Sequence, residues 1–175
     1  ELMRIISVYG YPPMWTRPQS FATLIHIILE QQVSLASAKA AFEKLKAKTG
    51  FITPSRLIRL TDSELKECYF SRQKTVYARE LANAIISRKL VLKKLAFLPD
   101  DTIRHQLTQI KGIGNWTVDV YLLFSLQRTD VFPMGDLAIV NALKEIKKLP
   151  ASLPKEKLLI IAEKWKPYRS IACIL

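Results

Sequence analysis

Two short stretches of the sequence hold the residue types best suited to chemistry, Lys111-Gly112-Ile113-Gly114 and Gly135-Asp136. Apolar residues at helical spacing flank the first stretch on both sides, which predicts a helix, a tight hairpin and a second helix. The paired glycines permit positive φ and the close approach of another backbone. Such a hairpin presents unpaired N–H groups and the positive end of a helix dipole, so it can hold a phosphate, and Lys111 adds a charge there. An ordinary corner between two helices is the alternative.

The second stretch offers one carboxylate. Asp136 comes directly before an apolar helical pattern over residues 137–146, and an aspartate at that place is typical of a helix N-cap. A carboxylate there can also stabilise a developing positive charge or activate a water molecule, and the two roles are compatible. Asp119 is the competing acid, but it falls on the second helix of the hairpin, where a structural role explains it better.

Helices must position both stretches. The chain has 175 residues, 49% of them hydrophobic, which suits one well-buried domain. Stretches at helical spacing recur along it, whereas alternating β-branched runs are missing, so we expect an all-α fold. Ser20 can cap a helix whose apolar stripe begins at Phe21, and Thr61-Asp62-Ser63-Glu64 fits a capping box.

The net charge and the cysteine content limit which partners and cofactors the chain can bind. The 27 basic and 15 acidic residues give a net charge of +12, which favours a polyanionic partner such as nucleic acid or an anionic membrane surface. Cys68 and Cys173 lie far apart, without a CxxC pair or a four-cysteine set, and are read as reduced core thiols. No run reaches the ~18 apolar residues of a membrane span. We therefore expect a soluble protein without a membrane partner.

The hairpin, Leu107 to Leu123, followed by Val131-Phe132-Pro133-Met134-Gly135-Asp136, resembles the signature of the helix-hairpin-helix (HhH-GPD) DNA glycosylase superfamily. Further stretches resemble the 3-methyladenine DNA glycosylase II branch and follow the expected order along nearly the whole chain. They are Pro12-Pro13-Met14-Trp15, Ile28-Leu29-Glu30-Gln31-Gln32-Val33-Ser34, Ser71-Arg72-Gln73-Lys74, Asn115-Trp116-Thr117 and Trp165-Lys166-Pro167-Tyr168-Arg169-Ser170.

The resemblance implies a two-lobed helical fold, formed by residues 1–175 as a single HhH-GPD domain. A central helical lobe is expected over about residues 30–125, and a second lobe from about residues 1–29 plus 126–175. DNA is expected to lie in the cleft between the lobes. The endonuclease III branch of this superfamily usually carries a four-cysteine iron–sulfur cluster, which this chain cannot bind, and no other cofactor is implied.

The resemblance also assigns roles to single residues. Asp136 matches the catalytic carboxylate. Trp116 stands where bifunctional members carry a nucleophilic lysine, which implies hydrolysis by water. Trp116 and Trp15 are expected to line the base pocket, although either could instead pack in the core. Gln32 falls on or beside the residue that fills the gap left by the extruded base, where some members have an apolar wedge; a plain polar helix terminus is the alternative.

The resemblance also implies contacts with the DNA backbone and with a cation. Lys111, Gly112, Ile113 and Gly114 would grip the DNA backbone, and a monovalent cation (Na⁺ or K⁺) would sit on the carbonyls of Thr108, Ile110 and Ile113. Ser71, Arg72 and Lys74 either contact a DNA backbone or form a solvated helix start. The chain has Tyr69 where the family usually has a glycine.

The function implied is that of a monofunctional DNA glycosylase of base excision repair, which flips and hydrolytically excises alkylated purines from double-stranded DNA. It would act as a monomer, in the cytoplasm (nucleoid) of a bacterium or the nucleus of a eukaryote. Two alternatives stay open: a DNA-binding module without catalysis, and a bifunctional glycosylase and lyase. The sequence does not choose among 3-methyladenine, 7-methylguanine, ethenoadenine, hypoxanthine and uracil as the lesion.

Overall fold

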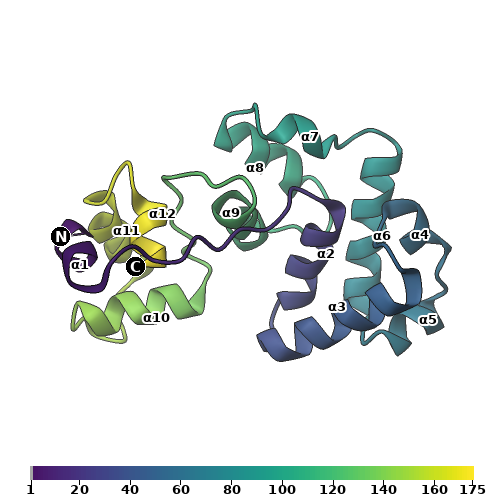
Figure 1. Cartoon of the computed structure of the whole chain (residues 1–175), viewed down its shortest axis with the longest axis horizontal. Helices are drawn as coiled ribbons and strands as arrows, with labels where there is room; N and C mark the ends of the chain where they lie inside the picture. Colours follow the sequence, from purple (N-terminus) through teal and green to yellow (C-terminus); the bar gives the residue numbers. More distant parts are fainter. Residues whose placement is uncertain (1) are drawn as a thin grey trace. The chain divides into compact units, whose positions relative to one another are not determined.

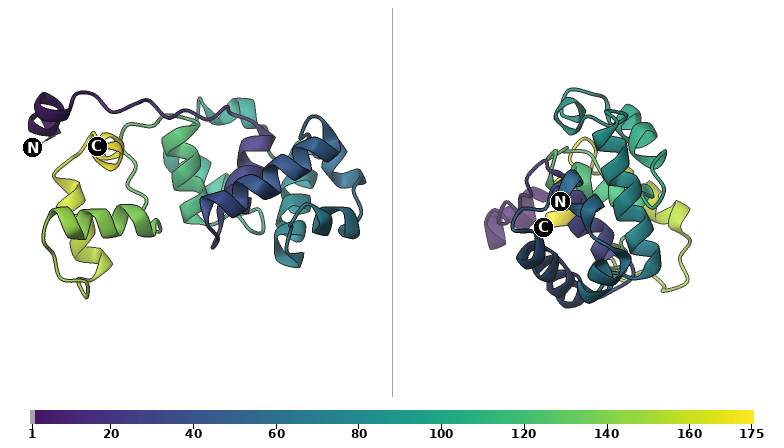
Figure 2. Two further views of the ribbon diagram at one scale, coloured as in Figure 1. Left: turned by 60° about the horizontal axis from the view of Figure 1, so that its bottom comes forward. Right: turned by 90° about the vertical axis from the view of Figure 1, so that its right-hand side faces the viewer.

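The computed structural model describes residues 2–175, which form α-helices and connecting loops and no strand (Figure 1; Figure 2). In chain order the helices are α1 Leu2–Tyr9, α2 Phe21–Glu30, α3 Leu35–Thr49, α4 Pro54–Arg59, α5 Asp62–Glu67, α6 Arg72–Ile86, α7 Leu92–Leu95, α8 Asp100–Thr108, α9 Asn115–Phe124, α10 Leu137–Ile146, α11 Lys155–Glu163 and α12 Arg169–Ile174. The all-α class expected from the sequence is confirmed. Among residues 2–175 there is no helix with the length and apolar character needed to cross a bilayer.

One compact unit spans Arg17–Tyr121 and contains the hairpin. Its organising helix is α6, which packs against α2, α4 and α5, while α2 also packs against α3. Helix α2 is apolar on almost every side, and Leu24, Ile25, Ile27 and Ile28 are completely buried. A helix that is hydrophobic all round is stable only in such a position, surrounded by other elements.

This unit differs from the central lobe expected from the sequence. Residues 17–29 were expected with the two ends of the chain, but they belong to the unit of Arg17–Tyr121. The reason is the burial of α2 between α3 and α6. Arg17 strengthens the link, because its guanidinium donates two hydrogen bonds of 2.9 Å to the buried carboxylate of Glu30.

The second unit comprises residues 2–16 and Leu122–Leu175. Its core is built from buried apolar residues of α10, α11 and the preceding loop, namely Phe132, Val140, Leu143, Leu158 and Ala162. Ser170 fixes that loop: its N–H donates to the carbonyl of Thr129, and its Oγ accepts from the N–H of Val131, both at 2.9 Å. Backbone hydrogen bonds and apolar packing therefore both hold the segment leading to Asp136 in place.

Local capping sets several helix starts as expected. Ser20 Oγ accepts a hydrogen bond of 3.1 Å from the N–H of Thr23 at the start of α2. At α5 the capping box is complete, since Thr61 Oγ1 accepts from the Glu64 N–H while the Glu64 carboxylate accepts from the Thr61 N–H. These bonds satisfy N–H groups that the first turn leaves without a helical acceptor.

Candidate functional site

The hairpin between α8 and α9 depends on one glycine for its conformation. Gly112 has φ of +94°, and a Cβ added there would lie 2.0 Å from Cγ of Tyr77 on α6. Any residue with a side chain would therefore have to displace Tyr77 and adopt an unfavourable φ. The apolar residues on either side, Ile110 and Ile113, are buried and anchor the turn, and the Ile113 N–H donates to the Ile110 carbonyl at 3.0 Å.

Gly114, unlike Gly112, is not required by the packing of the hairpin. Nothing lies within 4 Å of a Cβ built at Gly114, and the residue is exposed, as is Lys111. In the described part of the chain, the N–H groups of Gly112 and Gly114 have no hydrogen-bond acceptor. The turn thus presents backbone donors and a lysine to solvent at the start of α9, which is the arrangement that binds phosphate.

The C-cap residue of α2, Gln31, ties this hairpin to the turn between α2 and α3. Gln31 Nε2 donates to the Gly112 carbonyl and to Thr117 Oγ1, each at 2.9 Å. The neighbouring Gln32 is exposed and has φ of +56°, so it projects from a left-handed turn. Sequence reasoning singled out Gln32 and missed Gln31, because a bond across 81 residues leaves no periodic signal.

The competing acid on α9 is committed to structure. Asp119 is buried, and its Oδ1 accepts a hydrogen bond of 2.6 Å from Arg104 of α8, which also donates to Asn115 Oδ1 at 3.1 Å. Burial raises the pKa of the Asp119 carboxyl, and the Arg104 guanidinium opposes that rise. The ion pair braces the two helices of the hairpin, which agrees with the structural role expected for this acid.

Asp136 lies in the other unit and caps α10. Its Oδ1 accepts hydrogen bonds from the N–H groups of Ala138 at 3.0 Å and Ile139 at 3.2 Å, and its own N–H donates to the Pro133 carbonyl at 2.9 Å. The side chain is half-buried. Two backbone donors and the turn over residues 133–136 therefore fix the direction of this carboxylate, as a catalytic acid requires.

The two candidate pocket tryptophans belong to different units. Trp116, in the first turn of α9, is half-buried, so it is neither a sealed core indole nor a freely exposed ring. Trp15 follows α1, and 56% of its surface is exposed, which excludes the alternative that it plugs the core. Both indoles keep accessible surface, as a stacking partner needs.

The carbonyls expected to bind a cation and the thiol of Cys68 lie in the unit of Arg17–Tyr121. The expected cation ligands, the carbonyls of Thr108, Ile110 and Ile113, come from the end of α8 and the hairpin turn. The Ile110 oxygen accepts one hydrogen bond, from the Ile113 N–H, and keeps a second lone pair. No cluster of three or more metal-binding side chains occurs among residues 2–175. Cys68 is buried, and burial raises the pKa of its thiol, which makes it unreactive.

The family of the chain follows from comparison with known proteins. The model of the HhH-GPD superfamily of base excision DNA repair proteins matches residues 25–167. The chain belongs to this superfamily. DNA-3-methyladenine glycosylase 1 of Schizosaccharomyces pombe is 31% identical to it over 176 residues, covering 98% of this chain and 77% of the yeast protein.

A solved structure and a second relative agree with that assignment. The structure of the S. pombe 3-methyladenine DNA glycosylase Mag1 in complex with abasic DNA matches with a TM-score of 0.90 and 31% identity, covering 99% of this chain and 88% of that one. The YfjP protein of Bacillus subtilis is 30% identical over 99% of this chain, which spans 63% of that relative's length. The superfamily and the branch expected from the sequence are confirmed.

Proposed function

We propose that this protein is a monofunctional DNA glycosylase that flips alkylated purines of the 3-methyladenine type out of duplex DNA and removes them by hydrolysis, leaving an abasic site. One observation carries the proposal: a helix-capping carboxylate with fixed direction, Asp136, stands in a chain that matches a 3-methyladenine DNA glycosylase bound to abasic DNA over 99% of its length. The protein acts as a monomer on double-stranded DNA.

The hairpin binds the DNA backbone. The N–H groups of Gly112 and Gly114 donate to one phosphate, and Lys111 supplies a positive charge beside it. Backbone donors read no base edge, so the grip is independent of sequence, as the search for rare damage requires. A monovalent cation on the carbonyls of Thr108, Ile110 and Ile113 would add a further positive charge to the same phosphate site.

Asp136 performs the chemistry. Breaking the N-glycosidic bond builds positive, oxocarbenium-like charge on the sugar, which a nearby carboxylate stabilises while it orients or deprotonates the attacking water. An alkylated purine such as 3-methyladenine already carries positive charge, so its departure needs little help from a general acid. A single carboxylate therefore suffices. No lysine occupies the position of Trp116, so the sugar is attacked by water and the strand stays intact.

Aromatic and polar side chains select and replace the base. Trp116 stacks on the extruded base, and an electron-rich indole face favours a cationic ring by about 0.5–2 kcal/mol. Gln32, exposed on its left-handed turn, enters the duplex and fills the gap that the base leaves. Its amide can hydrogen-bond the orphaned partner base, which an apolar wedge cannot do.

The test compares wild-type protein with Asp136→Asn on methylated duplex DNA, with Glu156→Gln, an exposed acid in the first turn of α11, as the control. Asparagine caps a helix as well as aspartate, so the fold is retained. We expect wild-type protein and the control to release methylpurines and to yield strand breaks only after hot alkali. The rate for Asp136→Asn should fall by at least about 100-fold.

Two other outcomes would replace the proposal. DNA binding without any base release by the wild-type protein would favour a non-catalytic module that recognises damaged DNA. Strand breaks without alkali, together with a covalent adduct trapped by borohydride, would identify a bifunctional glycosylase and lyase whose amine lies outside the position of Trp116.

A further inference from the structure

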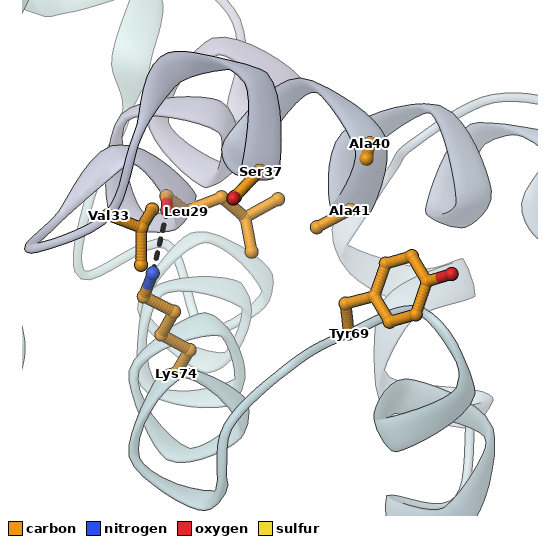
Figure 3. Close-up of a pocket in the computed structure, with 7 residues that line it drawn as sticks. All are labelled: Leu29, Val33, Ser37, Ala40, Ala41, Tyr69 and Lys74. Carbon is orange, nitrogen blue, oxygen red and sulfur yellow. Dashed lines mark hydrogen bonds between the residues drawn. The ribbon is translucent and has the colours of Figure 1, made fainter.

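A hollow of about 310 Å³ lies beside the turn that carries Gln32. Its walls are formed by Val33, Ser37, Ala40, Ala41, Tyr69 and Lys74. Figure 3 shows Lys74 and Tyr69 at its two ends, with the α3 residues Ser37, Ala40 and Ala41 along one side. Ser37, Ala40 and Ala41 therefore form a wall of small side chains in a hollow that has Lys74 at one end and an aromatic ring at the other, and Leu29 and Val33 complete the lining.

Lys74 is held in place at one end of the hollow by a hydrogen bond. Its Nζ donates to the Leu29 carbonyl near the end of α2 at 2.6 Å (Figure 3). An ammonium group has three protons, so two remain for other acceptors. Lys74 is half-buried, and this burial lowers the pKa of its ammonium group. In such surroundings a carbonyl oxygen is a better partner than in bulk solvent.

Tyr69 is exposed, although its backbone conformation is unfavourable for a residue with a side chain. It has φ of +64° and 60% of its surface is accessible, so burial does not repay the left-handed conformation. The Lys44 ammonium lies 4.0 Å from the ring centroid. An exposed ring held in an unfavourable backbone conformation beside a hollow is typical of a binding residue.

The hollow and the hairpin lie in the same unit and are joined by one side chain. Gln31 binds the Gly112 carbonyl and Thr117, whereas Leu29 and Val33, on either side of that turn, line the hollow. A duplex held by the hairpin therefore runs close to the α2–α3 turn. If Gln32 enters the duplex there, the base opposite the lesion loses its pairing partner beside the hollow.

We propose that this hollow receives the base opposite the extruded nucleotide and selects thymine. The proposal rests on the proposed function, since it requires a flipped base. Thymine presents carbonyl oxygens to the Lys74 ammonium and a methyl group to the alanines, the contact that alanine makes with this base elsewhere. Its ring stacks against Tyr69. Thymine is also the natural partner of adenine, from which 3-methyladenine derives.

Other bases fit less well. Cytosine and adenine carry an exocyclic amino group, a donor that faces the Lys74 donor unfavourably. Uracil keeps both carbonyls but lacks the methyl group, so it separates the contribution of the alanine wall from that of Lys74.

The experiment measures equilibrium binding by fluorescence anisotropy, in the Asp136→Asn background so that no base is excised. The probes are duplexes with a tetrahydrofuran abasic analogue opposite thymine, uracil, cytosine or adenine, and an undamaged duplex. Lys74→Met keeps the aliphatic stem but removes the donor, and Tyr69→Gly removes the ring. Lys39→Met, an exposed lysine on α3 that does not line the hollow, is the charge-matched control.

We expect the duplex with thymine to bind about fivefold more tightly than those with cytosine or adenine, with uracil in between. Lys74→Met and Tyr69→Gly should abolish the preference, while Lys39→Met should weaken all duplexes equally. Circular dichroism confirms that each variant is folded; Tyr69→Gly has no reason to lose stability, since it relieves positive φ.

Equal affinities for all opposite bases would overturn the inference. So would a preference that survives both Lys74→Met and Tyr69→Gly. A uniform loss of affinity in Lys74→Met, without a change in preference, would assign Lys74 to a phosphate contact instead. Failure to bind abasic duplexes more tightly than undamaged DNA would contradict the proposed function itself, which distinguishes the two failures.

Discussion

Gly112→Ala tests whether packing against Tyr77 requires a glycine at this position of the hairpin. The new Cβ would lie 2.0 Å from Cγ, 2.4 Å from Cδ1 and 2.5 Å from Cβ of Tyr77. These atoms are at the root of the ring, so a rotation about χ1 cannot move all of them away. The methyl group must push α6 and the hairpin apart, in addition to forcing an L-residue to adopt φ of +94°.

The magnitude follows from these two costs. A left-handed conformation costs a residue with a side chain about 1–2 kcal/mol, and overpacking costs about 1–3 kcal/mol. We expect the free energy of unfolding to fall by about 2–5 kcal/mol. With a urea dependence of about 2 kcal/mol per molar, the unfolding midpoint should fall by about 1–2.5 M, as measured by circular dichroism at 222 nm.

Gly114→Ala is the matched control, because a Cβ there meets no atom within 4 Å. Its free energy of unfolding should change by less than about 0.5 kcal/mol, while its affinity for DNA falls because the methyl group blocks the approach of the phosphate. Tyr77→Ala should restore part of the stability lost in Gly112→Ala, which a double-mutant cycle measures. The reasoning is refuted if Gly112→Ala is as stable as wild type, or if Gly114→Ala is destabilised equally.

Two further substitutions test the contacts that support the sites. Gln31→Leu removes the two hydrogen bonds that Nε2 donates to the Gly112 carbonyl and Thr117 Oγ1, and it should lower the free energy of unfolding in urea by about 1–2 kcal/mol, whereas Gln32→Leu should not. The Arg169 guanidinium lowers the pKa of the Asp130 carboxyl, so this acid stabilises the fold above its unfolded pKa and loses that contribution as the pH falls through its folded pKa. Asp130→Asn should be less stable than wild type at pH 7 and should depend less on pH below about pH 4 in thermal unfolding.

Features that depend on neighbours in sequence could be predicted. The cap at Ser20, the reciprocal bonds of Thr61 and Glu64, and the cap at Asp136 all form within three residues, so the residue types suffice to define them. The helical class follows from apolar spacing for the same reason. The assignment of Asp119 to structure also agreed, although its partner Arg104 was not foreseen.

Features that depend on distant neighbours could not be predicted. The extent of the unit that contains α2 is set by packing against α3 and α6, which no local pattern encodes. Tyr77 beneath Gly112 is equally invisible in sequence. The bond from Lys74 to Leu29 spans 45 residues. Tyr69 could be seen as a departure from the family pattern, but not as the wall of a hollow.

The division of the chain has a consequence for how binding and hydrolysis respond to substitution. The hairpin, Gln31 and the hollow belong to the unit of Arg17–Tyr121, whereas Asp136 is capped within the other unit. Variants at Gly114 or Gln31 leave the carboxylate's own hydrogen bonds intact, so they should raise the enzyme concentration that gives half-maximal rate and spare the rate at saturation. Asp136→Asn should do the opposite, since the proposed phosphate contacts do not involve it. Single-turnover kinetics over a range of enzyme concentrations separates these effects, and a loss of saturated rate in Gly114→Ala would mean that the grip on phosphate also aligns the sugar for attack.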